Sequence, residues 1–235
     1  MYKQAIENIL SQEQIRRCDF HTHSFFSDGD LLPMELLRRA HVFGHQVYAI
    51  TDHASASNLD IIPKLKKDCE LATKHWGIIA LPGVELTHVP ADAIEEIAKK
   101  ARDQGAIIIV LHGETISEPV EPGTNLKGAN SKAIDILAHP GMLSDQEAKL
   151  CKKNNVLVEI TSNSNHSKTN GITARVGLEN HADFIQNTDT HSSSNMITYD
   201  GAKKVLIAAG LDEKEANRTM QDNIRKLLTK TLEYF

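Results

Sequence analysis

The chain has 235 residues, of which 40% are hydrophobic, and its 26 basic and 31 acidic side chains give a formal charge of −5. This composition supports one globular domain with an ordinary core and gives no electrostatic reason to bind a long nucleic-acid backbone. The three cysteines form no CxxC pair, so we expect free thiols in a reducing compartment rather than a disulfide framework.

The chain shows no segment typical of export or membrane insertion. Its first residues are polar, and the longest aliphatic run, residues 106–111, is far shorter than the roughly 20 residues that cross a bilayer. We therefore expect a cytoplasmic protein that contacts no membrane.

In chain order, the pattern predicts an amphipathic helix near residues 2–15, within an N-terminal segment 1–16. Seven short apolar runs then predict buried parallel strands, near 18–21, 47–51, 78–84, 107–111, 134–138, 156–160 and 183–188. Between and after them, helical patterns occupy 33–43, 62–76, 91–104, a stretch capped by Ser144 and Glu147, 199–209 and 212–230, the last within a C-terminal segment 212–235. We expect residues 1–235 to form a single domain.

Strands and helices that alternate in this way predict an α/β barrel or a doubly wound sheet. Side chains of metal-ligand type follow most of the predicted strands, and this favours the barrel, whose strand ends converge on one mouth. The longest irregular segment, 113–130, is long enough for a functional loop.

The candidate metal ligands have one feature in common. They lie at or after the carboxyl ends of the predicted strands. His21 and His23 are two residues apart, so on a strand both imidazoles point the same way. Histidine mixed with carboxylate suits Zn, Fe or Mn, and each such ion uses three or four protein ligands. Nine candidates therefore predict two or three ions, with Glu85 as the natural bridge: His21, His23, Asp28, His53, Glu85, His112, His139, Asp189 and His191. We expect the remaining helical or strand-entry histidines to be surface or packing residues: His41, His45, His75 and His181.

Several clustered divalent ions favour one chemistry above others. They lower the pKa of a bridging water to make hydroxide, and they bind the oxygens of a phosphoryl centre during in-line attack. Hydrolysis of a phosphoester by a metal-bridging hydroxide is therefore the leading hypothesis, and amide hydrolysis is its main competitor.

These motifs follow one another in the order of a known family, which the chain resembles from residue 18 to residue 191. They are Asp19-Phe-His-Thr-His23, Ser27-Asp28-Gly29, Thr51-Asp52-His53, Gly83-Val84-Glu85, Leu111-His112-Gly113, Ala138-His139-Pro140-Gly141 and Thr188-Asp189-Thr190-His191. The family is PHP, named for polymerase and histidinol phosphatase. The resemblance implies a distorted (β/α)7 TIM-like barrel and a phosphoesterase with two or three Zn, Fe or Mn ions.

The resemblance also implies how the candidate ligands divide. His21, His23, Glu85 and Asp189 would hold the first metal; Glu85, His112 and His139 the second; Asp28, His53 and His191 the third. Some members have histidine at the position of Asp28, so aspartate here would weaken or change the third metal. Asp19 is expected to orient a ligand histidine rather than to bind metal.

In similar phosphatases the region after the sixth strand grips the substrate phosphate. By this resemblance Arg175 would bind phosphate, and His166 would either bind phosphate or protonate the leaving oxygen. We therefore expect catalytic roles for His166, Arg175, Asp189 and His191. His88 and the 113–130 loop, with Glu114, Asn125 and Lys127, would border the same mouth and influence specificity.

The leading function is hydrolysis of a small phosphomonoester, with histidinol phosphate as the family's obvious example. One alternative is a phosphodiesterase or exonuclease that acts on nucleotides or short oligonucleotide ends. Another is an amidohydrolase-like enzyme that cleaves C–N bonds, although many of those barrels carry a bridging lysine where His112 stands. The last is a non-catalytic metal-binding module, which the full set of candidate ligands argues against.

Overall fold

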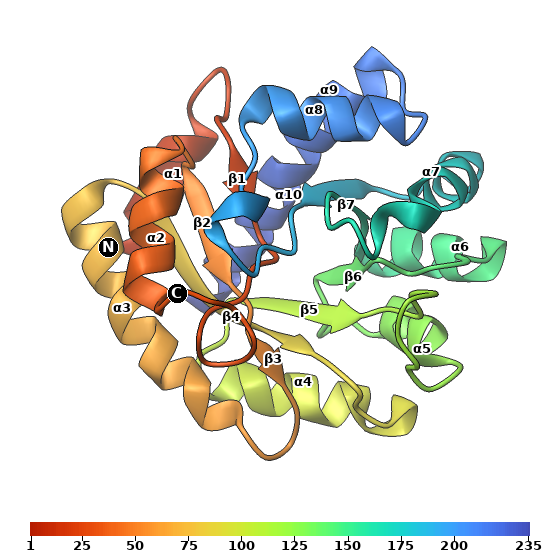
Figure 1. The fold of residues 1–235 in the computed structure, drawn as a ribbon, viewed down its shortest axis with the longest axis horizontal. Helices are drawn as coiled ribbons and strands as arrows, with labels where there is room; N and C mark the ends of the chain where they lie inside the picture. Colours follow the sequence, from red (N-terminus) through yellow and green to blue (C-terminus); the bar gives the residue numbers. More distant parts are fainter.

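The computed structural model describes all residues 1–235, with strands and helices alternating along the chain (Figure 1). Seven parallel strands lie in the order β1-β2-β4-β5-β6-β7-β8, and a short β3 pairs with β4 outside this path. Each of the seven overlaps a predicted strand, so the strand prediction is confirmed. The strands are β1 (Cys18–Asp19), β2 (Val47–Ile50), β3 (His53–Ala54), β4 (Ile79–Leu86), β5 (Ile108–His112), β6 (Ile136–Ala138), β7 (Leu157–Thr161) and β8 (Phe184–Asn187).

The first and last strands of this sheet meet. Thr22 and Thr190 form an isolated parallel bridge, and the backbone N–H of Phe20 donates to Asn187 Oδ1 at 2.9 Å. The sheet is therefore a nearly closed barrel, which confirms the distorted (β/α)7 architecture and excludes the doubly wound sheet.

Helices surround these strands (Figure 1). They are α1 (Tyr2–Leu10), α2 (Pro33–Val42), α3 (Ile62–Trp76), α4 (Ile94–Asp103), α5 (Thr124–Asn130), α6 (Asp145–Asn154), α7 (Asn170–Glu179), α8 (Tyr199–Ala208), α9 (Glu213–Met220) and α10 (Asp222–Thr231). Single 3₁₀ turns are η1 (Leu59–Ile61), η2 (Ala91–Ala93), η3 (Ser167–Thr169), η4 (Ser193–Asn195) and η5 (Leu232–Tyr234).

Local signals set several helix boundaries. The Ser144 side chain accepts a hydrogen bond from the Glu147 backbone N–H, and the Glu147 side chain accepts one from the Ser144 N–H, so α6 begins at the predicted capping box. Helix α3 ends at Gly77, whose φ of 70° lies in the left-handed region that glycine adopts easily.

Four helical segments differ from prediction, and one of them, α7, lies where no helix was predicted. The N-terminal helix ends at Leu10, and the C-terminal segment forms two helices that meet at Gln221. The Gln221 side chain bonds the backbone N–H and C=O of Ile15, a distant contact that no local pattern contains. The segment predicted to be irregular contains α5, which begins after Gly123 at a φ of 95°.

The core consists of three hydrophobic clusters. One fills the barrel interior with alternate strand residues, and Ile6 of α1 and Leu228 of α10 close its amino end. The other two lie outside the strands, beneath the surrounding helices. Each cluster contains one buried free cysteine: Cys18 in the interior, Cys69 beneath α2 and α3, and Cys151 in the largest outer cluster. Every helix is too short or too polar to span a membrane.

Candidate metal centre

The alternation that fills the barrel interior also positions the polar residues at its carboxyl end. Leu81 of β4 and Val110 of β5 belong to the interior cluster. Side chains an even number of residues further along a strand share that face, and these are Glu85 and His112. On β8, Ile185 belongs to the same interior cluster, and Asp189 follows four residues later. The apolar layers of the barrel thus end in a layer of metal-ligand side chains.

A cavity of about 340 Å³ opens at this end, and no hydrophobic residue lines it. We call it the histidine cavity, and it also contains no lysine or arginine. Its lining residues are Asp28, His53, Glu85, His112, Glu118, His139, Asn163, Ser164, Asn165, His166, Asp189, His191 and Asn195.

The first group of donors is His21, His23, Glu85 and Asp189, all buried. His21 Nε2 lies 3.3 Å from Glu85 Oε1 and 3.5 Å from Asp189 Oδ1. His23 Nε2 lies 3.5 Å from Glu85 Oε2 and 3.1 Å from Asp189 Oδ1. Four ligands bound tetrahedrally at 2.0–2.2 Å would be about 3.3–3.6 Å apart, so these separations fit one ion.

Several atoms of this group have no hydrogen-bond partner. They are His21 Nε2, both ring nitrogens of His23, and Glu85 Oε1. Buried polar atoms are normally paired, because leaving one unpaired costs about 1–3 kcal/mol. A metal ion would satisfy these lone pairs together, so the residues present fit a divalent cation.

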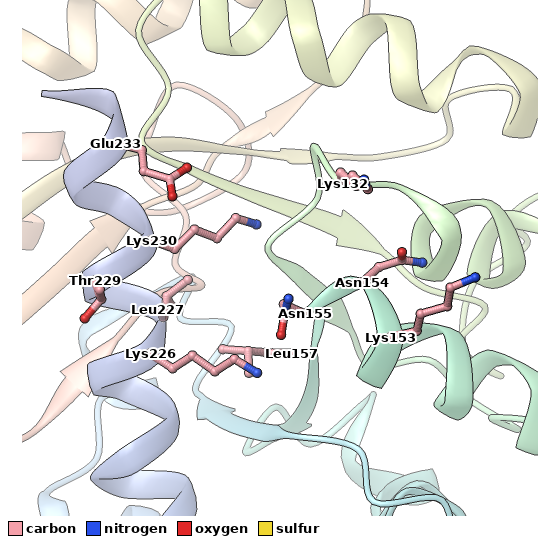
Figure 2. A pocket seen from close by; sticks show the side chains of 10 residues that line it. All are labelled: Lys132, Lys153, Asn154, Asn155, Leu157, Lys226, Leu227, Thr229, Lys230 and Glu233. Carbon is pink, nitrogen blue, oxygen red and sulfur yellow. The ribbon is translucent and has the colours of Figure 1, made fainter.

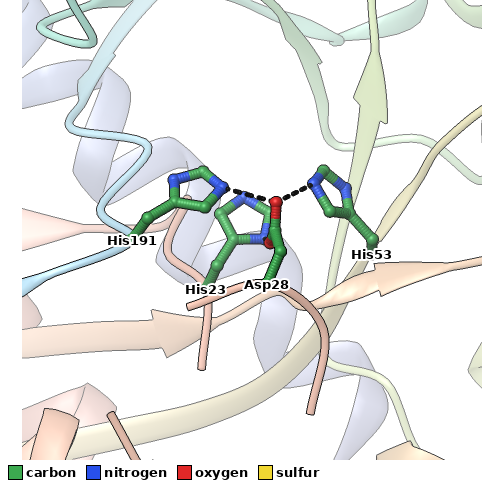
Figure 3. A group of neighbouring side chains, drawn as sticks. All are labelled: His23, Asp28, His53 and His191. Carbon is green, nitrogen blue, oxygen red and sulfur yellow. Dashed lines mark ion pairs between the residues drawn. The ribbon is translucent and has the colours of Figure 1, made fainter. Parts of the chain in front are cut away.

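A second group surrounds Asp28, as Figure 3 shows. Asp28 Oδ2 lies 3.4 Å from His53 Nε2 and 3.2 Å from His191 Nε2, while Oδ1 is 3.8 Å from His23 Nδ1. His53 also approaches Glu85 Oε2, at 2.8 Å from Nδ1. Asp28 is half exposed, yet it reaches the place where a third-metal ligand was predicted.

A further group contains His112 and His139, as predicted, together with His166. One ring nitrogen of each lies within 4.8 Å of the others, and all three side chains are buried. Glu85 Oε1 is 3.5 Å from His139 Nε2 and so connects this group with the first. The sequence predicted the position of His166 near the mouth but not its place in a donor group.

The histidines of the centre stabilise the ionised form of its carboxylates. Burial raises the pKa of Glu85, but His21 and His53 outweigh it and hold that pKa well below its ordinary value. Burial lowers the pKa of His53, but Glu85 and Asp28 raise it to about 10. The carboxylates are therefore ionised at neutral pH and favour a bound cation.

Glu159 of β7 supports this centre and was not among the predicted site residues. It is buried, its Oε1 accepts from His21 Nδ1 at 2.9 Å, and its Oε2 accepts from the His139 backbone N–H at 3.1 Å. A carboxylate that holds the second nitrogen of a ligand histidine fixes the ring orientation. The detectable signal was an acidic residue inside the apolar run 156–160. Asp19, by contrast, contacts the backbone N–H of His21 rather than its ring.

Arg175 does not line the histidine cavity, so the structure gives no support to the prediction that it grips phosphate. It projects from the exposed face of α7, where its guanidinium is 3.2 Å from Glu179 and its side chain is 57% exposed. The buried face of α7 is formed by Thr173, Ala174, Val176 and Gly177. The phase of this helix therefore directs Arg175 to solvent.

The 113–130 loop faces the cavity with a different residue from those predicted. Glu114 Oε1 accepts from the Asn125 backbone N–H at 2.9 Å, and Lys127 pairs with exposed Asp92, so these residues hold the loop itself. None of the three predicted loop residues lines the histidine cavity, whereas Glu118 does. Sequence analysis missed Glu118 because its approach depends on how the whole loop folds back.

Three histidine or aspartate residues at the mouth have positive φ. The values are 52° for His88, 24° for His139 and 53° for Asp189. Residues other than glycine rarely occupy this region, and such strain concentrates at functional sites. His41, His45, His75 and His181 do not line the cavity, as predicted.

A larger cavity, of about 560 Å³, lies at the opposite, amino end of the barrel (Figure 2). We call it the lysine cavity. Lys226 and Lys230 of α10 border it, at 2.7 Å from Asp183 Oδ2 and 2.8 Å from Asp135 Oδ1. Its lining residues are Lys132, Lys153, Asn154, Asn155, Leu157, Lys226, Leu227, Thr229, Lys230 and Glu233.

Comparison with known proteins matches residues 19–230 to the PHP domain. The uncharacterized protein MJ1295 of Methanocaldococcus jannaschii is 47% identical over 214 residues, which span 90% of this chain and 98% of that protein. The 5'-3' exoribonuclease of Haemophilus influenzae is 38% identical over 72 residues, which span 31% of this chain and 24% of that protein.

Among solved structures, the histidinol phosphate phosphatase of Lactococcus lactis, complexed with zinc, L-histidinol and phosphate, has the same fold. The TM-score is 0.63 at 14% identity, covering 85% of this chain and 95% of that one. Similarity at this identity establishes a common barrel.

Proposed function

This chain belongs to the PHP domain family of metal-dependent phosphoesterases, and we propose that it hydrolyses a small phosphomonoester. PHP domains bind divalent metals, and we propose two or three Zn, Fe or Mn ions here. The predicted ligands remain the proposed ones: His21, His23, Asp28, His53, Glu85, His112, His139, Asp189 and His191.

One observation carries the proposal: the histidine cavity is small, wholly polar and built around donor atoms spaced for metal ions. Its volume of about 340 Å³ suits a substrate of metabolite size. Four carboxylates line it without a lysine or arginine. Bound cations would therefore favour entry of a phosphate dianion, because they offset the repulsion from these carboxylates in a partly buried site.

When bound, divalent ions would act as Lewis acids on the phosphoryl oxygens and would supply an activated water. The chain's own residues would orient the substrate. Ser164 and Asn165 line the cavity beside His166 and would offer neutral hydrogen-bond donors to phosphate, whereas the Asn163 amide donates to Asp189 Oδ2 at 2.9 Å. Burial and the neighbouring His139 lower the pKa of His166 to about 4. His166 would then be neutral at pH 7. A neutral imidazole suits a role in ligand binding better than protonation of the leaving oxygen.

The test is hydrolysis of a generic aryl phosphate and a panel of phosphomonoesters, histidinol phosphate included, by the metal-loaded enzyme. We expect phosphate release that a chelator abolishes and added metal restores. A matched Arg175→Ala protein should behave as wild type. If the fully loaded enzyme leaves every phosphomonoester intact, the proposal fails.

A second candidate is release of mononucleotides from oligonucleotide ends, and the similarity to the Haemophilus exoribonuclease favours it. The same cavity would then hold only the terminal nucleotide. Short single-stranded oligonucleotides with a 5'-phosphate distinguish the two functions. Mononucleotide release faster than monoester hydrolysis would favour the nuclease.

We also propose that the protein works in a reducing compartment, such as the cytoplasm. Its three cysteines are buried and unpaired. Proteins of oxidising compartments more often use cysteines in disulfides.

A further inference from the structure

The 113–130 loop delivers one carboxylate to the metal centre. Glu118 Oε2 lies 3.0 Å from His112 Nε2, and Oε1 lies 3.6 Å from His166 Nε2. Both histidines are buried, whereas the Glu118 side chain is 42% exposed. Glu118 thus covers His112 and His166 from the solvent side.

The loop around Glu118 is anchored rather than free. The Ser117 hydroxyl donates to the Asn165 backbone C=O at 2.6 Å, and Thr115 Oγ1 bonds His166 Nδ1 at 2.8 Å. On the far side, Glu114 Oε1 accepts from the Gly123 backbone N–H at 2.9 Å. These bonds fix the backbone on both sides of Glu118. The contact between Glu118 and His112 is therefore held in place by the fold of the loop.

The close packing beneath the loop has a further requirement. Gly141, at a φ of 66°, lies against the Glu114 backbone so tightly that a Cβ would come within 1.9 Å of the Glu114 C=O. Glycine after the His139-Pro140 pair therefore lets this loop approach the centre. The loop therefore packs directly against the segment that carries His139.

The separations from Glu118 are close to those of metal ligands. Ligand atoms of a tetrahedral Zn²⁺ are about 3.3–3.6 Å apart; the distance from Glu118 to His166 is at the upper limit of that range, and the distance to His112 is about 0.3 Å below it. Because Nδ1 of His166 is bonded to Thr115 Oγ1, Nε2 is the ring nitrogen that remains for a metal ion, provided that Nδ1 carries the ring proton. His112, His139 and His166 supply only neutral nitrogens, and Glu118 would add the negative charge that compensates a divalent ion.

We propose that Glu118 is a loop-borne metal ligand that, with His166, completes the position held by His112 and His139. This inference rests on the proposed function only in that the centre holds divalent ions. It makes the 113–123 loop part of the metal centre, so that the rim of the cavity supplies one of the ligands of this ion.

The experiment measures Zn²⁺ retention during titration with a competing chelator, for the full chain and for Glu118→Gln and Glu118→Ala. We expect one ion per chain to be lost at a chelator concentration at least about tenfold lower in both variants. The matched control is Glu121→Gln, which removes a charge from the same loop but does not line the histidine cavity. It should retain Zn²⁺ as wild type does.

Substitution with Co²⁺ gives a second measurement, because the visible spectrum of the bound ion reports its ligand set. We expect the Glu118 variants to change that spectrum and Glu121→Gln to leave it unaltered. If wild type binds metal and the Glu118 variants match it in retention and spectrum, the inference is overturned while the phosphatase proposal stands. If wild type binds no Zn²⁺ at all, both are overturned.

Discussion

The two ends of the barrel both carry cavities lined by ionisable side chains, but they satisfy their charges differently. In the lysine cavity, Lys226 donates to the buried carboxylate of Asp183 at 2.7 Å, and Lys230 lies 2.8 Å from that of Asp135. In the donor group at the histidine cavity, Glu85 Oε1, His21 Nε2 and both ring nitrogens of His23 have no hydrogen-bond partner. The larger cavity is therefore explained by internal ion pairs, whereas the smaller one calls for a ligand. A cluster of unpartnered metal-ligand atoms, rather than cavity volume, therefore distinguishes the carboxyl end.

The largest effect that tests this contrast is loss of Glu85. Glu85→Gln should reduce kcat/KM for an aryl phosphate on the order of 10³-fold, because the carboxylate contacts three donor groups of the centre. Steady-state kinetics with metal analysis would measure this. A variant with near wild-type activity would show that the carboxyl end is not the reactive one.

Removal of metal should have the largest effect on stability. Ions at 100 times their dissociation constant stabilise the native state by about 2.7 kcal/mol, which corresponds to a change in Tm of roughly 5–11 °C in a domain of this size. Thermal unfolding before and after chelation would measure it. If Tm is unchanged after metal has verifiably been removed, the buried ligand atoms of the centre do not destabilise the fold when they have no partner.

At the amino end, Asp183→Asn should reduce stability rather than activity. Asp183 is buried and pairs with Lys152, Arg218 and Lys226, which are all partly exposed. We expect a loss of roughly 2 kcal/mol in the free energy of unfolding, below the 3–5 kcal/mol of fully buried pairs. Denaturant unfolding gives this value, and an activity loss greater than about twofold would contradict the division between the two ends.

The stabilisation by Asp183 should depend on pH. Burial raises the pKa of Asp183, but Lys226 and Lys152 outweigh it and lower that pKa below its ordinary value. A depressed carboxyl pKa stabilises the fold above the unfolded pKa, near 3.9, and this contribution is lost as pH falls through the folded value. The difference between wild type and Asp183→Asn should therefore shrink below about pH 4. Unfolding curves at pH 7, 4 and 3 would show it; a constant difference would exclude the ionised carboxylate as the cause.

The smallest effect belongs to Arg175→Ala. An exposed ion pair four residues apart on a helix contributes about 0.3–0.5 kcal/mol, so stability should barely change. Activity should stay within about twofold of wild type, because Arg175 is not in the cavity. Larger losses in activity, with stability intact, would support the predicted phosphate-binding role.

The parts of the molecule that could be predicted are those that depend on residues close together in the sequence. The seven strands are continuous apolar runs, and α6 begins at its own capping box. Because parallel strands share one carboxyl end, ligand-type residues after them could be placed together without knowing their exact geometry.

The parts that could not be predicted depend on distant contacts or on helix phase. Glu118 approaches His112 only because bonds to Asn165 and within the loop hold it there. Arg175 required the first residue of α7 to be known, since a shift of two positions would turn it toward the core. Glu159 gains its role from His21, 138 residues earlier in the chain.

The cysteines provide a built-in set of reporters for local unfolding. Burial raises the pKa of Cys18 and of Cys151 to about 12, and raises that of Cys69 well above its ordinary value. Since only the exposed thiolate reacts, each cysteine should be alkylated only when its surroundings open. The three lie in three separate clusters, so site-resolved labelling rates would give the opening free energies of the barrel interior and of the two outer layers separately.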